Sequence, residues 1–369
     1  MPTAFYNGTI YTGEQILTQK AILVQNGYIN EIVEESAIPG GYEKEDLNGM
    51  NIASSFIDLQ IYGGNGKLFS QDLSVASLQA TYQYCISGGA SHFMITMATN
   101  SIEKFLRGIE VVKNYWNEGG KGLLGLHLEG PYLNPVKKGA HIEQYIKQPT
   151  IDEVQMLLDK GAGVFKMMTL APERCDDAVI DLLLKNNILV SAGHSNAVSD
   201  EATHAFNNGI TTATHLFNAM SAFQHRAPGM VGAIYDHPKV MCSVVCDGVH
   251  VDFAAVRISK KIMKERLFFI TDAVAETNTG DYIHVYKGNR YTLPDGTLSG
   301  SSLTMMQCVK NAVEHVGIEL DEALRMASLY PAKLLGKDCK LGKIEKDYEA
   351  SFVIFDEKFA IYRNLQKRR

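Results

Sequence analysis

The sequence lacks the features that mark several specialised classes of protein. No stretch approaches the roughly 18 uninterrupted apolar residues of a membrane-spanning helix, so we expect no membrane span. The first residues, MPTAFYNGTIYTG, lack the basic and apolar regions of a signal peptide, so we expect none. The formal net charge is −6, whereas a nucleic-acid-binding domain is usually basic. We therefore expect a cytoplasmic protein that binds neither a membrane nor a nucleic acid.

Two recognisable motifs are also missing. None of the cysteines forms a C-x-x-C pair, which predicts scattered, reduced thiols. No G-x-G-x-x-G follows the first strand-like run, which argues against the open, doubly wound sheet of dinucleotide-binding proteins. The cysteines are Cys85, Cys175, Cys242, Cys246, Cys308 and Cys339.

An alternation of strand-like and helix-like segments fills the middle of the chain. Such alternation is typical of a parallel sheet with helical crossovers, and eight repeats over about 280 residues fit an α/β fold of the (β/α)8, TIM-like barrel type. A hairpin-like stretch at about 273–300 follows the last run, and we expect it to lie over the barrel mouth. The eight runs are 55–63, 91–99, 122–130, 163–171, 187–195, 209–217, 240–248 and 267–273.

Both ends of the chain have a different rhythm. Short β-like pieces broken by Asn-Gly and Gly signals occupy the first fifty residues or so, and similar pieces return near the C-terminus. We infer that the two ends build one small β domain. The predicted division is 1–52 and 339–369 for the small β domain and 53–338 for the barrel.

Four polar residues stand at the ends of strand-like runs, namely Glu129, His194, His215 and Asp272. The carboxyl ends of barrel strands open on one face, so these residues should converge in one pocket. Two imidazoles and a carboxylate suit a catalytic divalent metal that keeps a position open for water, and a further carboxylate can serve as general base and acid. The alternative for each residue alone is a packing or helix-capping role, which four coincidences at four strand ends make less attractive.

Six motifs together give a resemblance to a known family. They are HLEGP at 127–131, SAGHSNA at 191–197, THLFNAM at 214–220, DGVHVD at 247–252, FITDA at 269–273 and GTLSGSSLTM at 296–305. As an ordered set, these motifs resemble those of N-acetylglucosamine-6-phosphate deacetylases of the amidohydrolase superfamily. The resemblance implies a (β/α)8 barrel, a small β-sandwich domain built from both chain termini, and a homodimer.

The resemblance also implies roles for individual residues. Glu129, His194 and His215 match the metal ligands, and Asp272 matches the catalytic acid and base. His141 matches the residue that contacts the substrate near its acetamide carbonyl. The residues matched to sugar-phosphate contacts are Asn218, Ala219, Arg226 and His250. An arginine with its planar fork of donors and a histidine are chemically suited to a phosphate dianion.

Two departures from the family pattern stand out. Many amidohydrolases carry H-x-H at the end of the first strand, where this chain has Gln60 and Tyr62, and an amide and a phenol are poor metal ligands. We therefore expect one divalent metal ion, zinc first, with iron, manganese and cobalt as alternatives. The C-terminal stretch FAIYRNLQKRR also lacks the usual closing strand, which predicts a weaker small domain or a disordered tail.

The function implied by the resemblance is hydrolysis of N-acetyl-D-glucosamine 6-phosphate to D-glucosamine 6-phosphate and acetate, in amino-sugar catabolism and recycling. The nearest alternative is the same reaction on N-acetylgalactosamine 6-phosphate. A second is another amidohydrolase reaction, cyclic-amide hydrolysis or deamination, which usually needs the missing H-x-H. A third is a non-catalytic sugar-phosphate sensor. The absence of H-x-H favours this alternative, whereas the presence of all four strand-end residues argues against it.

Overall fold

The computed structural model describes residues 2–366 and divides the chain into two compact units. The barrel unit comprises Leu59–Tyr84 and Phe93–Leu303. The terminal unit comprises the residues up to Asp58, Cys85–His92, and the residues from Thr304 onward. The domain boundaries predicted from the sequence differ from those of the two units, and they stay a prediction.

Eight parallel strands follow one another in chain order in a single sheet, which confirms the predicted fold class. The segment after the eighth strand returns to the first. The backbone N–H of Tyr62 donates to the carbonyl of Ala273 at 2.9 Å, and that of Asp272 donates to the carbonyl of Gln60 at 3.0 Å, so the sheet closes into a barrel. The strands are β8 (Phe56–Ile61), β11 (Ala90–Ala98), β12 (Leu123–Glu129), β13 (Phe165–Leu170), β14 (Leu189–Ala192), β15 (Thr212–Ala213), β16 (Met241–Val244) and β17 (Leu267–Phe269).

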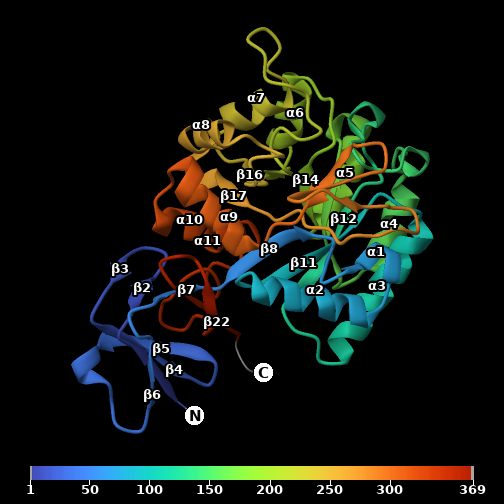
Figure 1. Ribbon diagram of the computed structural model, residues 1–369. Helices are drawn as coiled ribbons and strands as arrows, with labels where there is room; N and C mark the ends of the chain where they lie inside the picture. The colour runs from blue at the N-terminus through green and yellow to red at the C-terminus, as the bar shows by residue number, and fades with distance from the viewer. Residues whose placement is uncertain (1, 367–369) are drawn as a thin grey trace. The chain divides into compact units, whose positions relative to one another are not determined.

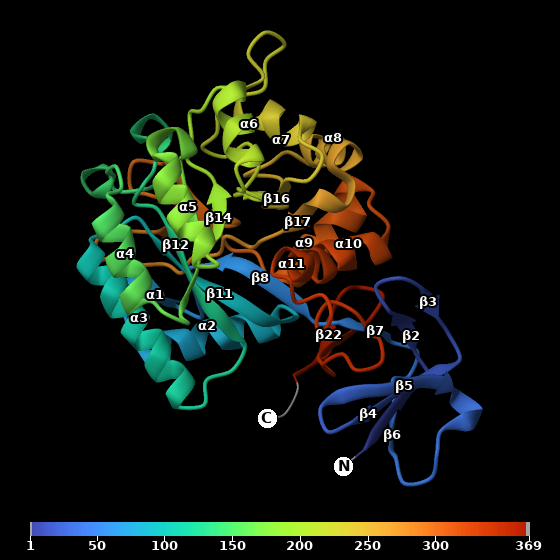
Figure 2. The same ribbon diagram turned by 180° about the vertical axis from the view of Figure 1, so that it is seen from behind.

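Helices connect these strands and lie outside them, as Figures 1 and 2 show for β11, β12 and β14 and the surrounding helices. Their sequences carry clear start signals. The side chain of Ser101 caps the third helix and that of Thr150 the fourth, each accepting a hydrogen bond from a backbone N–H three residues on. The helices are α1 (Phe69–Asp72), α2 (Val75–Ser87), α3 (Ile102–Asn117), α4 (Ile151–Lys160), α5 (Asp177–Lys185), α6 (Ser199–Asn207), α7 (Gly229–Asp236) and α8 (Phe253–Met263).

The insertion after the eighth strand forms a small antiparallel sheet of β18 (Val285–Tyr286), β19 (Arg290–Thr292) and β20 (Leu298–Ser301). Tyr282 and Val274, on the way into this sheet, pack against Tyr62 and Leu68 in one apolar cluster. Leu68 belongs to a short hairpin of β9 (Gly63–Gly64) and β10 (Lys67–Leu68). The predicted hairpin over the barrel mouth is therefore present.

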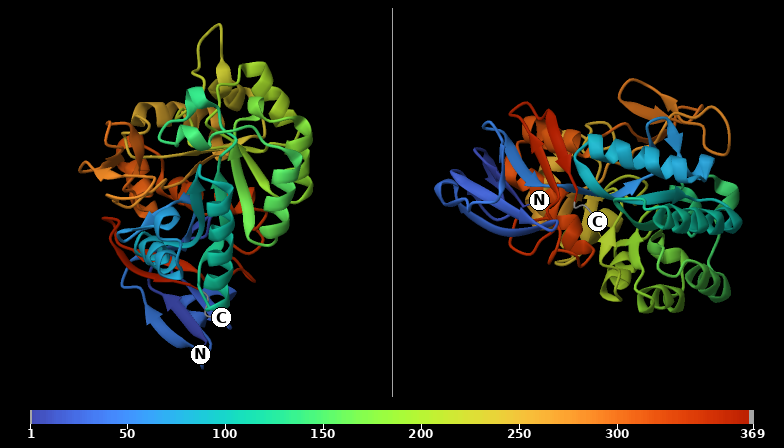
Figure 3. Two further views of the ribbon diagram at one scale, coloured as in Figure 1. Left: turned by 90° about the vertical axis from the view of Figure 1, so that its right-hand side faces the viewer. Right: turned by 90° about the horizontal axis from the view of Figure 1, so that it is seen from below.

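The terminal unit joins the two ends of the chain in one pair of sheets (Figure 3). Phe5 from the N-terminal part packs edge-on against Phe352 from the C-terminal part, with 5.6 Å between ring centroids. One sheet has the order β5-β4-β1-β6 and the other β22-β21-β7-β2-β3. The strands are β1 (Thr3–Tyr6), β2 (Thr9–Tyr11), β3 (Ile16–Leu17), β4 (Lys20–Gln25), β5 (Tyr28–Glu34), β6 (Glu43–Asp46), β7 (Asn51–Ser54), β21 (Phe352–Phe355) and β22 (Ile361–Leu365). This unit also contains α9 (Met305–Asn311), α10 (Leu320–Ala327) and α11 (Leu329–Leu334).

The expectation that the C-terminus lacks a closing strand is wrong. Strand β22 pairs antiparallel with β21 from Phe352↔Leu365 to Phe355↔Ile361. The Ser55 hydroxyl lies 2.8 Å from the side-chain oxygen of Asn364, which ties the edge strand to the segment after β7. The last basic residues of the QKRR tail lie outside the described residues.

Two further expectations concern membranes and thiols. Among residues 2–366 no helix is both long and apolar enough to cross a membrane. All six cysteines carry free thiols, as the absence of a C-x-x-C pair predicted.

Candidate active site

The carboxyl ends of the barrel strands bring the predicted polar residues to one cavity. Glu129 is the last residue of β12, whereas His194 and His215 each follow their strands, β14 and β15, by two residues. Asp272 lies in the segment after β17 that closes the barrel. All four line the same cavity, together with His141 from the loop after β12. The structure therefore confirms that residues far apart in sequence converge on one face.

Three of these residues have left-handed backbone conformations that their side chains disfavour. The φ angles are 49° at His194, 40° at His215 and 55° at Asp272. Such conformations cost about 1–3 kcal/mol each in non-glycine residues and persist only where the surrounding structure enforces them. Their concentration around one cavity marks it as the functional part of the barrel.

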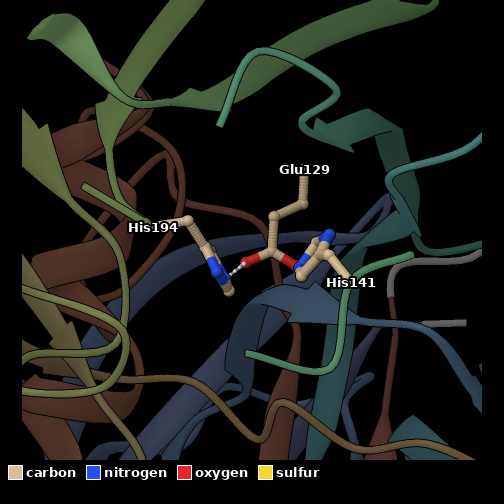
Figure 4. A group of neighbouring side chains, drawn as sticks. All are labelled: Glu129, His141 and His194. Carbon is tan, nitrogen blue, oxygen red and sulfur yellow. Dashed lines mark ion pairs between the residues drawn. The ribbon is translucent and has the colours of Figure 1, made fainter. Parts of the chain in front are cut away.

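The carboxylate of Glu129 is the centre of the arrangement. Its Oε1 lies 3.3 Å from His194 Nε2 and 3.1 Å from His215 Nε2, and the two Nε2 atoms are 3.1 Å apart. Its Oε2 lies 3.1 Å from His141 Nε2. Figure 4 shows the carboxylate between the rings of His141 and His194. The side chains of all four residues are almost completely buried.

Hydrogen bonds made by the outer ring nitrogens distinguish the histidines. The Nδ1–H group of His194 donates a hydrogen bond to the carbonyl oxygen of Lys137, 2.9 Å away, so the neutral ring keeps its lone pair on Nε2. His141 has the opposite tautomer, because its Nδ1 accepts the backbone N–H of Thr99 at 3.2 Å and its Nε2 therefore carries the proton. His194 thus offers a lone pair to the centre, whereas His141 offers a hydrogen-bond donor.

The electrostatics of the centre favour an ionised carboxylate beside neutral imidazole. Burial raises the pKa of Glu129, but the charges and hydrogen bonds of His141 and His194 outweigh it and hold this pKa well below its usual range. Burial, with the nearby His141, lowers the pKa of His194. An ionised carboxylate and a deprotonated imidazole are the states in which these groups bind a metal.

The donor set fits one divalent metal. The lone pair of His194 Nε2 points at the carboxylate oxygen Oε1, an acceptor, and at His215 Nε2, and a cation among these three atoms would satisfy them all. By distance alone, Glu129, His141 and His194 also form a possible ligand group, with their atoms within 4.8 Å of one another. We prefer His215 to His141 as the third ligand, because the Nε2 of His141 carries its proton toward the carboxylate.

The residues matched to the sugar phosphate separate into two groups. Asn218, Ala219 and His250 line the cavity. Arg226 does not, because it is exposed on the loop between β15 and α7, where Gln224 and Ala227 pair with each other. The single chain therefore brings His250 to the cavity but leaves Arg226, the other residue predicted to bind the phosphate, outside it.

A buried carboxylate fixes the ring of His250. The Nδ1 atom of His250 lies 2.5 Å from Asp247 Oδ2, while Asp247 Oδ1 accepts the backbone N–H groups of Val249 and His250 at 2.8 and 2.7 Å. Burial raises the pKa of Asp247, but the hydrogen bonds and charge of His250 and these N–H groups outweigh it, so the pKa is lowered. The ionised Asp247 accepts a hydrogen bond from the Nδ1–H group of His250, so only Nε2 of His250 is left for a ligand.

Sequence profiles place the chain in a family. The profile of the Amidohydrolase family matches residues 54–367, and that of the NagA composite domain matches residues 4–52. The chain belongs to the amidohydrolase family. This membership agrees with the barrel, the carboxylate-centred histidine cluster and the resemblance seen in the sequence motifs.

Relatives with assigned functions support a closer relationship. This amidohydrolase is 36% identical to the N-acetylglucosamine-6-phosphate deacetylase of Haemophilus influenzae, over 98% of this chain and 97% of that one. It is 34% identical to the human protein of the same name, over 85% and 82% of the two chains. The N-acetylgalactosamine-6-phosphate deacetylase of Escherichia coli O157:H7 is 29% identical, over 92% and 95%.

Solved structures give the same picture. The N-acetylglucosamine-6-phosphate deacetylase of Pasteurella multocida superimposes with a TM-score of 0.95 at 35% identity, covering 100% of this chain and 98% of that one. A mutant of the Mycobacterium smegmatis deacetylase, solved in complex with N-acetyl-D-glucosamine-6-phosphate, gives a TM-score of 0.91 at 27% identity, covering 99% and 98%. The resemblance stated from the motifs is therefore confirmed.

The first strand of this amidohydrolase does carry polar groups into the site, although it lacks H-x-H. The Gln60 Nε2 atom lies 3.1 Å from Glu129 Oε1, 2.8 Å from Asp272 Oδ1 and 2.9 Å from the Tyr62 hydroxyl. The Tyr62 hydroxyl in turn donates to Glu129 Oε2. Burial, followed by the charges of Glu129 and Asp272, raises the pKa of Tyr62 well above its usual range, so the phenol stays protonated.

Sequence reasoning missed the polar residues that the insertion contributes. His284 and Ser299 line the cavity and lie 2.9 Å apart, His284 Nδ1 to Ser299 Oγ. Burial lowers the pKa of His284 to about 4, so its ring is neutral near pH 7. No motif marks His284, and Ser299 lies within the GTLSGSSLTM motif, which gave it no role. The available signal for His284 was the position of the hairpin after the eighth strand.

Proposed function

We propose that this amidohydrolase hydrolyses the acetamide of N-acetyl-D-glucosamine 6-phosphate to D-glucosamine 6-phosphate and acetate. The observation that carries the proposal is the convergence of Glu129, His194 and His215 with His141 and Asp272 in one cavity. The names of the relatives that match nearly the whole chain supply the substrate. The galactosamine epimer is less well supported, because its named deacetylases are less similar.

The residues proposed to hold the metal are Glu129, His194 and His215. A divalent ion there would act as a Lewis acid toward the acetamide carbonyl and would lower the pKa of a water molecule. Zinc is the first choice, with iron, manganese and cobalt as alternatives, since carboxylate and imidazole ligands suit all four. One ion is expected, because Gln60 and Tyr62 replace the usual H-x-H.

Asp272 is the proposed proton carrier. Its carboxylate accepts a proton from the attacking water as the water oxygen bonds to the acetamide carbon. Asp272 then returns this proton to the nitrogen as the C–N bond breaks, so that the amine leaves as a neutral group. His141 Nε2–H donates to the carbonyl oxygen, where negative charge develops during attack.

The phosphate is proposed to bind at the other part of the cavity, near Asn218, Ala219 and His250. The backbone N–H of Ala219 and the amide of Asn218 are neutral donors, and His250 supplies an imidazole held by Asp247. Arg226 remains a proposed phosphate ligand. It reaches a phosphate here only if its exposed loop moves, or if the substrate is held by a second copy in the proposed homodimer.

The proposal extends to the cellular setting. A cytoplasmic location is supported by the six free cysteines and by the absence of a membrane-spanning helix among residues 2–366. Amino-sugar catabolism and recycling follows from the proposed substrate and products.

Acetate release by the purified protein tests the proposed function. The substrates are N-acetylglucosamine 6-phosphate, its galacto epimer and unphosphorylated N-acetylglucosamine, each before and after chelation and after adding back zinc, iron, manganese or cobalt. We expect chelator-sensitive turnover that is highest with the phosphorylated gluco sugar. No acetate release with any of the four metals would refute the deacetylase proposal. Faster turnover of the galacto epimer would change the proposed substrate to N-acetylgalactosamine 6-phosphate, while the proposed deacetylation would stand.

A further inference from the structure

The first barrel strand places one amide nitrogen where two catalytic carboxylates meet. Gln60, which is 1% exposed, has its Nε2 within hydrogen-bond distance of both Glu129 Oε1 and Asp272 Oδ1. The amide nitrogen carries two hydrogens, and ionised carboxylates are stronger acceptors than a phenol. The two N–H groups of Gln60 therefore point to the two carboxylates.

Tyr62 completes this contact from the same face of the strand. Residues two apart on a strand point to the same side, so both side chains face Glu129, and Tyr62 lines the cavity. The Tyr62 hydroxyl donates to Glu129 Oε2, the oxygen that faces His141, and its own oxygen lies 2.9 Å from Gln60 Nε2. Glu129 thus has a donor from the first strand on each of its oxygens.

Two carboxylates that share one buried position need positive charge or hydrogen-bond donors between them, because their mutual repulsion disfavours ionising both. A second cation held by H-x-H would meet this need in the usual pattern of the superfamily. An amide and a phenol meet it here with hydrogen bonds and without any charge. The positions of the donors, 2.8 Å from Asp272 and 3.1 Å from Glu129, are those of direct hydrogen bonds.

We propose that Gln60 and Tyr62 are positioning residues that replace a second cation, with Gln60 orienting Asp272 for proton transfer and Tyr62 orienting Glu129 for metal binding. The catalytic consequence for Asp272 rests on the proposed function. The consequence for metal binding does not, because it concerns the affinity and number of bound ions. Tyr62 donates to Glu129, whereas Gln60 is the first-strand donor to Asp272 and also contacts Glu129, so their substitutions have different signatures.

The first experiment replaces each donor by an apolar side chain of similar shape. In Gln60→Met we expect kcat at saturating metal to fall about 10- to 100-fold, the usual range for partners of metal-site groups, with KM unchanged. Gln60 also contacts Glu129, so kcat is compared only after the bound metal has been brought to the same level as in the unaltered protein. In Tyr62→Phe we expect the metal dissociation constant to rise about 10- to 100-fold, with kcat restored at saturating metal. Thr212→Val is the matched control, since its buried hydroxyl in the same barrel has no hydrogen-bond partner among the residues described.

The second experiment rebuilds the missing motif. The double variant Gln60→His, Tyr62→His is compared with the unaltered protein by elemental analysis after equilibration with zinc and removal of loosely bound ions. We expect the bound metal to rise from about one equivalent to about two, because two imidazoles would replace the donors beside Glu129 and Asp272. Circular dichroism and thermal unfolding confirm that each variant is folded.

The outcomes separate this inference from the proposed function. Wild-type kcat in Gln60→Met, or loss of activity matched by a comparable loss in Tm and metal, would overturn the positioning role of Gln60. Unchanged metal affinity in Tyr62→Phe would overturn that of Tyr62, and one equivalent of metal in the double variant would overturn the replacement of a cation. If the unaltered protein releases no acetate, the proposed function fails and the role of Gln60 in proton transfer fails with it. The two metal measurements still decide the role of Tyr62 and the replacement of a second cation.

Discussion

Replacing Asp272 by asparagine removes the proposed proton carrier with little change in shape. Asp272 is 9% exposed, and its Oδ1 receives a hydrogen bond from Gln60 at 2.8 Å. An asparagine can turn its carbonyl oxygen toward the same amide, so this hydrogen bond survives. What is lost is the ability to accept a proton from water, because an amide is not a base near neutral pH.

The expected effect is a fall in kcat of about 10²–10⁴-fold, the contribution of a positioned general acid and base. This corresponds to about 3–5 kcal/mol in the activation free energy. Metal content, KM and the thermal unfolding midpoint should stay close to those of the unaltered protein, since the three proposed ligands and the phosphate contacts are untouched. The assay is steady-state acetate release, with metal analysis of the same samples.

Two results would refute this reasoning. A kcat within a fewfold of the unaltered enzyme would show that another group moves the proton. Loss of the metal from Asp272→Asn would show that Asp272 acts as a ligand, so that the fall in kcat could not be assigned to proton transfer.

Three further substitutions follow from the site. His141→Asn should lower kcat about 10²–10³-fold, as loss of an oxyanion donor does, while metal content stays the same; loss of the metal would instead make His141 a ligand. Asp247→Asn should raise KM for the phosphorylated sugar more than for the unphosphorylated one, because it releases the His250 ring, and equal changes on both sugars would argue against phosphate binding there. His284→Ala should lower kcat/KM without changing metal content, and unaltered kinetics would exclude its ring from the substrate site.

The barrel could be predicted from the sequence because hydrophobic periodicity reports it directly. All eight apolar runs correspond to strands of the parallel sheet, and the polar residues Glu129, His194 and His215 stand at or just beyond strand ends. In a parallel barrel the carboxyl ends of all strands lie on one face. Residues at these ends are therefore expected to converge, even when they are far apart in the sequence.

Other features depend on geometry that periodicity does not encode. The closing strand β22 was missed because FAIYRNL lacks a glycine turn and alternates weakly, whereas its pairing with β21 is set by tertiary contacts. Arg226 was matched to the phosphate by the family resemblance, which does not report how its loop folds in a single chain, and here the loop leaves Arg226 exposed. His284 was missed because a residue in an inserted hairpin has no fixed relation to the strand ends.

The first strand is where the sequence and the structure lead to the most different interpretations of the same two residues. From the sequence, Gln60 and Tyr62 register only as the loss of two metal ligands, and that loss was the best reason to consider a non-catalytic protein. In the structure the same two side chains supply hydrogen-bond donors to Glu129 and Asp272, so the strand still supports the carboxylates that chemistry requires. The left-handed backbone at Asp272 has the same implication, because a conformation that its own side chain disfavours is held there by the barrel closure between Gln60 and Asp272. The departure from H-x-H therefore argues for an active site organised around one metal, and against a barrel that has lost its function.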